Sequence, residues 1–461
     1  MHRQAVAGID SSTQQTKLVV VDARSGELLR TSAMPHPDGT EIDPEHWWHA
    51  LEAAGASRPE DAAALSITAQ QHTTIFLDER GDPARDAILW NDLRASDSAD
   101  ALVDELGVDA WLDRTGLVPD SAHPVSKLRW LSEHEPEIAA RVESALLPHD
   151  WLTWRVLDRA QPPTTDRSDA STTGYWSATT GEYDAGLLRR AFGRELRVPT
   201  LVGPGEPAGV TASGLVVGSG SGDNPATHFS LDTAAGDVVI SVGTSATVSM
   251  RTDAPARDRD GVVDTMADVR SGFIPMVTML NGARVLTSTA QMLGVSLTEL
   301  DTLAGAGAPD AAGIIALPFL DGERNPRRPV SDGTLFGISR ASLTPTNMAR
   351  AAMLGLGCAT ANAMDALVRE CGPARRIFLV GGGSRSATLC QIFADLLQRP
   401  LLVPRDREHA AFGAARQAAW ALLGDLPQWP ELPTREIRPI AGPPGAWVTQ
   451  TRANYNARLT P

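Results

Sequence analysis

The chain has 461 residues, of which 42% are hydrophobic, and it carries a formal net charge of −15 at pH 7. A chain of this length exceeds what one hydrophobic core normally supports, so we expect a globular protein of two or three domains. The negative charge disfavours nucleic acid and anionic membranes as partners, and a phosphate-bearing ligand must therefore be bound by a local site.

The targeting and cysteine patterns favour the cytoplasm. The first residues, MHRQAVAGID, show no basic stretch followed by an apolar core, and no apolar run approaches the roughly 18 residues of a membrane span. Cys358, Cys371 and Cys390 have no CxxC spacing and no clustered histidines nearby, which favours buried thiols over disulfides or a zinc site. We therefore expect a cytoplasmic protein without membrane or nucleic-acid partners. The sequence is compatible with a homodimer but does not predict one.

The first expected element is a hairpin with an acid near its turn. Apolar runs predict strands over 5–9 and 18–21, joined by a loop rich in hydroxyls and amides. Asp10 follows the first strand, and Mg²⁺ prefers a carboxylate with retained water. Lys17 could neutralise charge on a bound phosphate chain. An ordinary polar hairpin, with Asp10 accepting N–H groups of the turn, accounts for the same residues.

Further polar groups follow the next predicted strands. A strand over 63–68 leads to Gln71 and His72, whose hydrogen-bonding groups suit hydroxyls in the ligand crevice of an α/β sheet. A structural histidine with satisfied hydrogen bonds is the plainer interpretation. The run 87–92 ends in an aromatic residue with polar neighbours, as in a sugar pocket, and the polar stretch 164–176 is either a surface connection or a part of the cleft.

The centre of the chain combines two kinds of candidate site. Asp223 and Asn224 follow a loop of glycine and serine and start a predicted helix. A β-branched strand over 238–242 then stops at Gly243 and Thr244, small residues that let backbone N–H groups approach a phosphate. An aspartate in a glycine loop is, however, more often a turn or cap residue.

The C-terminal part repeats this pattern. A long helix is predicted over 346–368, followed by a strand over 376–380 that ends in Gly382 and Gly383 before another helix. A glycine turn between strand and helix can bind phosphate or let a base and ribose lie on backbone, although it serves equally as a turn without ligand. From Leu426 onward we expect irregular, proline-rich chain.

Because each half opens with a strand that ends in a polar turn and continues with alternating strands and helices, two α/β lobes facing each other across a nucleotide are the simplest architecture. The stretch 201–209 is rich in glycine and proline and reads as irregular. We place the domain boundary soon after it, which gives domains 1–217 and 218–461.

Seven motifs in this order resemble the sugar kinases of the FGGY family, and among them most closely the xylulokinases. They are DSSTQQTK at Asp10, TAQQH at Thr68, ILWND at Ile88, SGDNPA at Ser221, SVGTS at Ser241, LPFLDGERNP at Leu317 and LVGGGSRS at Leu379. The motifs span nearly the whole chain. No single motif is specific for the family, but the ordered set is. The chain departs from the usual pattern at Ser11, Thr73, Leu354 and Ser386.

The resemblance implies two actin-like lobes of the ribonuclease H type, with ATP and Mg²⁺ between them and a sugar deep in the cleft. It implies that Asp223 accepts the proton of the attacking hydroxyl, in an ionised form expected from a reference pKa of about 3.9. The other implied contacts are the ketose with Gln71, His72 and Asn224, magnesium with Asp10, the first phosphate turn with Thr13, the second with Gly243 and Thr244, and adenosine with Gly382, Gly383 and Ser386.

The expected activity is transfer of the γ-phosphate of ATP to a small-molecule sugar. D-xylulose is the leading substrate, and another ketose or a polyol such as ribulose or glycerol is the alternative. A nucleotide-switched sugar-binding protein on the same scaffold would keep the phosphate turns but would not need Asp223. The presence of Asp223 beside Asn224 favours the kinase.

Overall fold

The computed structural model describes residues 4–320, 322–328, 330–405, 407–440 and 446–459. Asp321 of the LPFLDGERNP motif lies outside these ranges. The chain forms two compact units that are discontinuous in sequence: Met1–Thr233 with Asp253–Ile274 and Arg407–Glu431, and Ala234–Thr252 with Pro275–Asp406 and Leu432–Pro461. These units are defined by spatial compactness and do not test the domain boundary placed after residue 217, which stays a prediction. The segment 218–233, which contains Asp223, lies in the first unit.

A mixed sheet forms the centre of the first unit. Its strands are β1 (Ala5–Ser11), β2 (Gln15–Asp22), β3 (Leu28–Pro35), β5 (Ala64–Ala69), β11 (Pro207–Val210), β12 (Val216–Gly218) and β13 (Ser221–Gly222). They lie in the order β11-β12-β5-β1-β2-β3, with β13 also paired to β5. The first two strands form the predicted antiparallel hairpin, and β5 runs parallel to β1.

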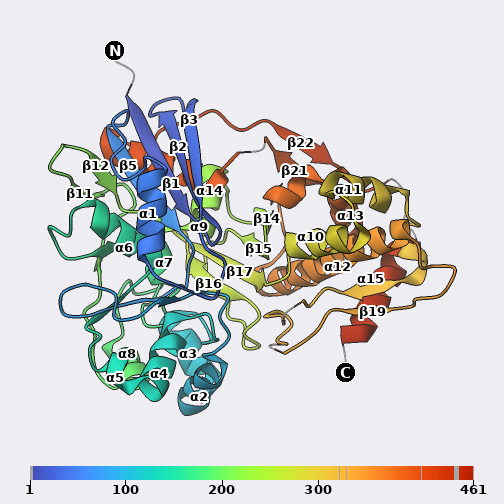
Figure 1. Cartoon of the computed structure of the whole chain (residues 1–461), viewed down its shortest axis with the longest axis horizontal. Helices are drawn as coiled ribbons and strands as arrows, with labels where there is room; N and C mark the ends of the chain where they lie inside the picture. Colours follow the sequence, from blue (N-terminus) through green and yellow to red (C-terminus); the bar gives the residue numbers. More distant parts are fainter. Residues whose placement is uncertain (1–3, 321, 329, 406, 441–445, 460–461) are drawn as a thin grey trace. The chain divides into compact units, whose positions relative to one another are not determined.

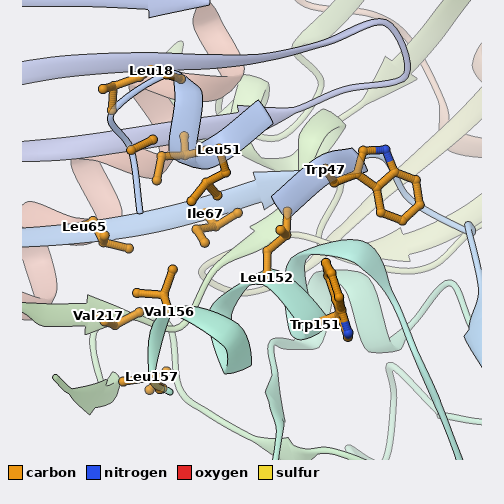
Figure 2. Close-up of a cluster of buried hydrophobic side chains, with 14 of the residues drawn as sticks. Leu18, Trp47, Leu51, Leu65, Ile67, Trp151, Leu152, Val156, Leu157 and Val217 are labelled. Atoms are coloured by element: carbon orange, nitrogen blue, oxygen red, sulfur yellow. The ribbon is translucent and has the colours of Figure 1, made fainter. Parts of the chain in front are cut away.

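The central strands β1, β2 and β5 are buried on both faces of the sheet. Their successive apolar side chains point to opposite sides, and each side is covered by helices. One face is covered by α1 (Glu45–Ala53) and α6 (Pro148–Val156). Figure 2 shows Trp47 and Leu51 of α1 and Leu152 of α6 gathered around Ile67 of β5. The other face, which includes Val6 of β1, packs against α14 (His409–Leu423).

The helix α14 lies unusually close to its neighbours. It is drawn in red beside the blue β1 in Figure 1, although more than half of the chain separates the two elements. A Cβ at Gly8 of β1 would overlap the carbonyl oxygen of Ala411, and a Cβ at Gly413 would overlap that of Ala226 in α9 (Asp223–Ser230). Glycine therefore lets α14 pack directly on the strand that carries Asp10 and on the helix that begins with Asp223.

The rest of the first unit surrounds a second apolar cluster that includes Trp111, Val125 and Leu128. Its other elements are β4 (Glu41–Ile42), β6 (Ile75–Leu77), β7 (Ala87–Ile88), α2 (Ser96–Leu106), α3 (Val108–Thr115), α4 (Pro124–His134), α5 (Pro136–Ala139), β8 (Ser144–Leu146), β9 (Thr164–Thr165), α7 (Arg167–Ala170), α8 (Ala185–Phe192) and β10 (Thr200–Leu201). The stretch 164–176 is almost wholly buried, so the surface alternative for it is wrong.

The second unit is built on another mixed sheet. Its strands run in the order β17-β15-β14-β20-β21-β22. The bounds are β14 (Val238–Val242), β15 (Ala246–Met250), β17 (Phe273–Met279), β20 (Ile377–Val380), β21 (Leu401–Pro404) and β22 (Thr434–Ile437), while β18 (Ile315–Leu317) and β19 (Thr334–Phe336) form a separate pair. Strand β16 (Asp264–Ala267) belongs to the segment Asp253–Ile274 of the first unit. Again an antiparallel hairpin, β14–β15, is followed by a parallel strand, β20.

The predicted long helix is α12 (Pro345–Cys371), which is largely buried. Of the described helices, α12 alone has the length and hydropathy of a membrane span, and 83% of its most apolar window is buried in the fold, as expected for a core helix. The other helical elements are α10 (Ala283–Leu293), α11 (Leu297–Ala306), η1 (Ala311–Gly313), η2 (Gly382–Arg385), α13 (Ala387–Leu397) and α15 (Ala446–Leu459).

The irregular C-terminus predicted from Leu426 is wrong in two places. Strand β22 pairs antiparallel with β21 at the sheet edge, and α15 follows it, with Tyr455 buried. The strand is short and largely exposed, and the helix has a weakly amphipathic sequence, so neither gives a clear periodic pattern. Their pairing and packing partners decide their structure, because tertiary contacts override weak local preference.

Candidate active site

The β1–β2 hairpin holds a buried carboxylate. Asp10 lies opposite Lys17 in the register, and its Oδ2 is 3.6 Å from the Lys17 Nζ, which also lies 2.7 Å from Oε2 of Glu408. Oδ1 of Asp10 has no hydrogen-bond partner among the described residues. Burial raises the pKa of Asp10, against the opposing effect of the Lys17 charge. A carboxylate oxygen left without a partner suits a divalent cation.

The ammonium group of Lys17 lies between the carboxylates of Asp10 and Glu408. Burial would lower the pKa of its ammonium group, but the negative charges of Asp10 and Glu408 outweigh this effect and raise it. The lysine is therefore held cationic, with its charge shared by these two groups. Its predicted contact with phosphate stays a prediction.

The tip of the same hairpin is held by the polar segment that follows β5. Thr13 donates through Oγ1 to Oε1 of Gln70 at 3.3 Å and accepts from Nε1 of Trp90 at 2.9 Å. Trp90 is the aromatic residue of the stretch 87–92, and nearby Asp92 is engaged by Arg94 at 2.8 Å. Three sequence-distant motifs therefore meet at Thr13.

Gln71 and His72 are both buried after the end of β5. His72 adopts a left-handed conformation, with φ of 64°, and its carbonyl oxygen accepts from Nζ of Lys127 at 2.9 Å. Its ring meets that of His123 edge to face, with centroids 5.1 Å apart. Such a backbone conformation is strained for a residue other than glycine, and strain of this kind concentrates at functional sites.

Asp223 is the first residue of α9, directly after β13. Its Oδ1 accepts from the backbone N–H of Asn224 at 2.8 Å and from Nδ2 of the same residue at 3.0 Å. Nδ2 of Asn224 also lies 3.4 Å from Oε1 of Gln71. The structure thus brings the predicted acid and amide beside Gln71, one of the predicted sugar contacts, within one unit.

The environment of Asp223 corrects the expectation of an ordinary carboxylate. Burial, together with the negative charge of Asp10, raises its pKa to about 7, and the hydrogen bond from Asn224 only partly offsets this. A base works best when its pKa lies near the working pH. Asp223 is therefore poised to take up and release a proton near neutrality.

In the second unit, three turns lie side by side at the ends of neighbouring strands. Gly282 after β17 donates from its backbone N–H to the carbonyl oxygen of Thr244 at 3.0 Å, and Ala283 donates to Gly243 at 2.6 Å. Gly381 after β20, with φ of 82°, lies so close to β14 that a Cβ would be 2.7 Å from the carbonyl oxygen of Val242. The predicted phosphate turn thus lies beside the predicted adenosine turn.

The residues predicted to contact adenosine differ in their surroundings. A Cβ on Gly382 would meet nothing within 4 Å, whereas a Cβ on Gly383 would be 2.6 Å from Cγ1 of Val242. Ser386 accepts from the backbone N–H of Leu389 as the N-cap of α13, and its hydroxyl donates to Asp301. Gly382 is thus open to a ligand, Gly383 is needed for packing, and the Ser386 hydroxyl already has protein partners.

Sequence reasoning missed several residues around these sites. Glu408 is far from β1 in the chain, and only the packing of α14 brings it to Lys17. Gln70 could have been found as the neighbour of Gln71 at a strand end. Glu323 accepts from the backbone N–H of Leu280 at 2.7 Å and so orders the turn after β17. The LPFLDGERNP motif that contains Glu323 does not indicate this partner.

Comparison with known proteins bears on both units. The model of the N-terminal domain of the FGGY family of carbohydrate kinases matches residues 5–241, and the model of its C-terminal domain matches residues 238–422. The chain is 39% identical over 437 residues to the xylulose kinase of Streptomyces coelicolor, covering 91% of this chain and 88% of the relative. It is 30% identical over 460 residues to the glycerol kinase of Methylorubrum extorquens, covering 92% and 91%.

A solved structure agrees with this relationship. The crystal structure of xylulose kinase from Bifidobacterium adolescentis superposes with a TM-score of 0.84 at 32% identity, over 99% of both chains. The predicted fold class, an α/β protein of two actin-like parts, is confirmed. ATP and a small-molecule sugar are the substrates that membership implies. This chain belongs to the FGGY family of carbohydrate kinases.

Proposed function

We propose that this carbohydrate kinase transfers the γ-phosphate of ATP to a hydroxyl of a ketopentose, with D-xylulose as the substrate and D-xylulose 5-phosphate as the product, in the cytoplasm. The observation that carries the catalytic part is Asp223, a partly buried carboxylate with a pKa raised to about 7 and with Asn224 and Gln71 beside it. The choice of substrate is supported by the 39% identity to a xylulose kinase, against 30% to a glycerol kinase.

In this proposal Asp223 accepts the proton of the attacking hydroxyl. Phosphoryl transfer needs little covalent help from the protein, so an oriented hydroxyl and a base within reach are the main requirements. Gln71, His72 and Asn224 hold the sugar through hydrogen bonds. Only one carboxylate oxygen of Asp223 accepts from Asn224, which leaves the other for the substrate.

Asp10 is the proposed magnesium residue. Its buried Oδ1 lacks a partner among the residues described, as an oxygen reserved for a cation or its water would. When bound, Mg²⁺ would neutralise charge on the phosphates of ATP. Thr13 and Lys17 of the first unit, and Gly243 and Thr244 of the second, are the proposed phosphate contacts.

The adenosine contacts are proposed at the second glycine turn. Gly382 is the strongest of the three residues, because its open side leaves room for a base or ribose. Gly383 and Ser386 would act indirectly, by shaping the turn and capping α13.

A substrate screen tests the proposal. The purified enzyme is given ATP and Mg²⁺ with D-xylulose, D-ribulose, xylitol or glycerol, and release of ADP is coupled to a spectrophotometric readout. We expect the highest kcat/KM for D-xylulose. A higher value for glycerol would overturn the assignment of D-xylulose as the substrate. A non-catalytic, nucleotide-switched sugar-binding protein would release no ADP with any of the four.

A further inference from the structure

A buried cluster of charged side chains lies behind the turn that leads into Asp223. His149 and Asp150 come from the first turn of α6, and Asp166 and Asp169 come from the segment around α7. All four are buried. None of the four was singled out from the sequence, in which Asp166 and Asp169 lie within the polar stretch 164–176.

The imidazole of His149 is the positive partner of this cluster. Its Nδ1 lies 2.6 Å from Oδ2 of Asp169 and 3.4 Å from Oδ1 of Asp150. Burial alone would lower the pKa of His149, but the charges of Asp150, Asp169 and Asp166 and the hydrogen bond to Asp169 raise it to about 10. The neighbouring carboxylates therefore favour the protonated ring, whose Nδ1 is held by Asp169.

These side chains also include the groups that bind metals, since one ligand atom from each of His149, Asp150 and Asp169 lies within 4.8 Å of the others. However, Nδ1 of His149 and Oδ2 of Asp169, two of the atoms that would bind an ion, already form a hydrogen bond with each other. An ion pair explains the geometry without a further ligand.

The other edge of the imidazole faces the turn before Asp223. Gly220 has φ of 80°, and a Cβ at this position would be 2.8 Å from Nε2 of His149 and would overlap Cδ2. The ring therefore lies against the bare backbone of Gly220, so that any larger residue there would displace either the ring or the turn.

Neighbouring side chains hold the same turn from other directions. Oγ of Ser168, next to Asp169 on α7, accepts from the N–H of Gly222 at 3.1 Å. Nε2 of Gln417 on α14 donates to the carbonyl oxygen of Gly220 at 2.8 Å. Asp223 follows one residue after Gly222, so the position of its carboxylate depends on this turn.

We propose that His149 is a positioning residue for catalysis: held by Asp169, its ring fixes the turn at Gly220 and thereby places Asp223 against the sugar hydroxyl. The inference rests on the proposed role of Asp223 as the base. A displacement of about 1 Å at a reacting group can cost about 100-fold in rate. Loss of the ring should therefore affect kcat more than nucleotide binding.

The test compares His149→Gln, which removes the charge, with His149→Lys, which keeps a cation beside Asp169. We expect kcat to fall by about 10- to 100-fold in H149Q, with the KM for ATP changed by less than about twofold. H149K should recover part of the lost kcat. The matched control is Leu152→Ala on the same helix, whose side chain belongs to the apolar cluster with Trp47 and Ile67; this substitution should lower the melting temperature and keep kcat.

Wild-type kcat in folded H149Q, or an equal loss of kcat in L152A, would overturn the positioning role. If H149Q gives no folded protein, Asp169→Asn decides the question, because it keeps the size of the side chain that orients the ring and removes its charge: a loss of kcat with an unchanged KM for ATP supports the role, and wild-type kcat contradicts it. Asp223→Ala separates the two proposals. Retained turnover in D223A would overturn the base itself, whereas its loss together with wild-type kcat in H149Q would overturn only the inference about His149.

Discussion

The two units share an arrangement of strands, but different kinds of residue follow those strands. In the first unit the β1–β2 hairpin and the parallel strand β5 end in charged and amide side chains, among them Asp10 and Gln71. In the second unit the β14–β15 hairpin and the parallel strand β20 end in small residues, among them Thr244 and Gly382. The first unit thus places charged and amide side chains at the ends of its strands, whereas the second places small residues there and leaves the backbone accessible.

This difference explains why the two sites should fail in different ways. In the proposed function, the first unit relies on Asp10 and Asp223, carboxylates whose pKa values are raised by burial and neighbouring charge. The second depends on the absence of side chains, since N–H groups can approach a phosphate only where no Cβ intervenes. Substitutions in the first unit should therefore change the rate of the chemical step, and substitutions in the second should change nucleotide affinity or stability.

The largest effect is expected for Asp223→Ala. Loss of a general base typically costs about 10²- to 10⁴-fold in rate. Turnover should fall by this amount while ATP binding, measured by calorimetry, stays within about twofold, because the nucleotide contacts are proposed elsewhere. Wild-type turnover in D223A would remove the base assignment, and Asn224→Ala, which deletes only one hydrogen bond to the carboxylate, provides a milder comparison.

Asp10→Asn should raise the Mg²⁺ concentration for half-maximal activity by about 10- to 100-fold, as for other groups that support a metal site. The substitution keeps the size of the side chain but removes the charge. Thr16→Ser on the neighbouring strand is the matched control. Direct titration with Mn²⁺, followed by its paramagnetic signal in the presence of ATP, gives a readout independent of turnover, and an unchanged affinity in D10N would contradict the assignment.

The pH profile should follow the ionisation of Asp223. Because its pKa is raised to about 7 and the base must be ionised to accept a proton, kcat/KM should rise through this pH and fall about tenfold from pH 6 to pH 5. Mg²⁺ beside Asp10 would move the limb to lower pH. His72→Gln is the control: if the limb disappears in H72Q, it reports His72 and the assignment to Asp223 fails.

The smallest expected effects separate two adjacent glycines in the second unit. Gly382→Ala has open space around its Cβ, so stability should be kept while the KM for ATP rises by about fivefold, equivalent to ~1 kcal/mol. Gly383→Ala presses on Val242, so the free energy of unfolding should fall by about 1–3 kcal/mol. Thermal unfolding and ATP kinetics of both variants test this, and a lower melting temperature for G382A than for G383A would contradict it.

Much of the chain could be predicted where the local pattern is strong. The hairpin that carries Asp10, the strand before Gly243 and the long helix α12 all follow from apolar runs or helical periodicity. The polar residues at strand ends were found for the same reason, since a break in an apolar run marks the end of a buried strand. Strand β22 and helix α15 escaped prediction because their sequences are polar and their partners lie elsewhere in the chain.

The sequence by itself determined which residues could do chemistry and where the strands that carry them begin and end, because side-chain type and periodicity are local properties. Only the tertiary structure decided that Glu408 pairs with Lys17, that His149 lies against Gly220 and that Asp223 has a pKa near 7. These features arise from burial and from charges brought together across long stretches of chain, and such distances have no signature in any local pattern.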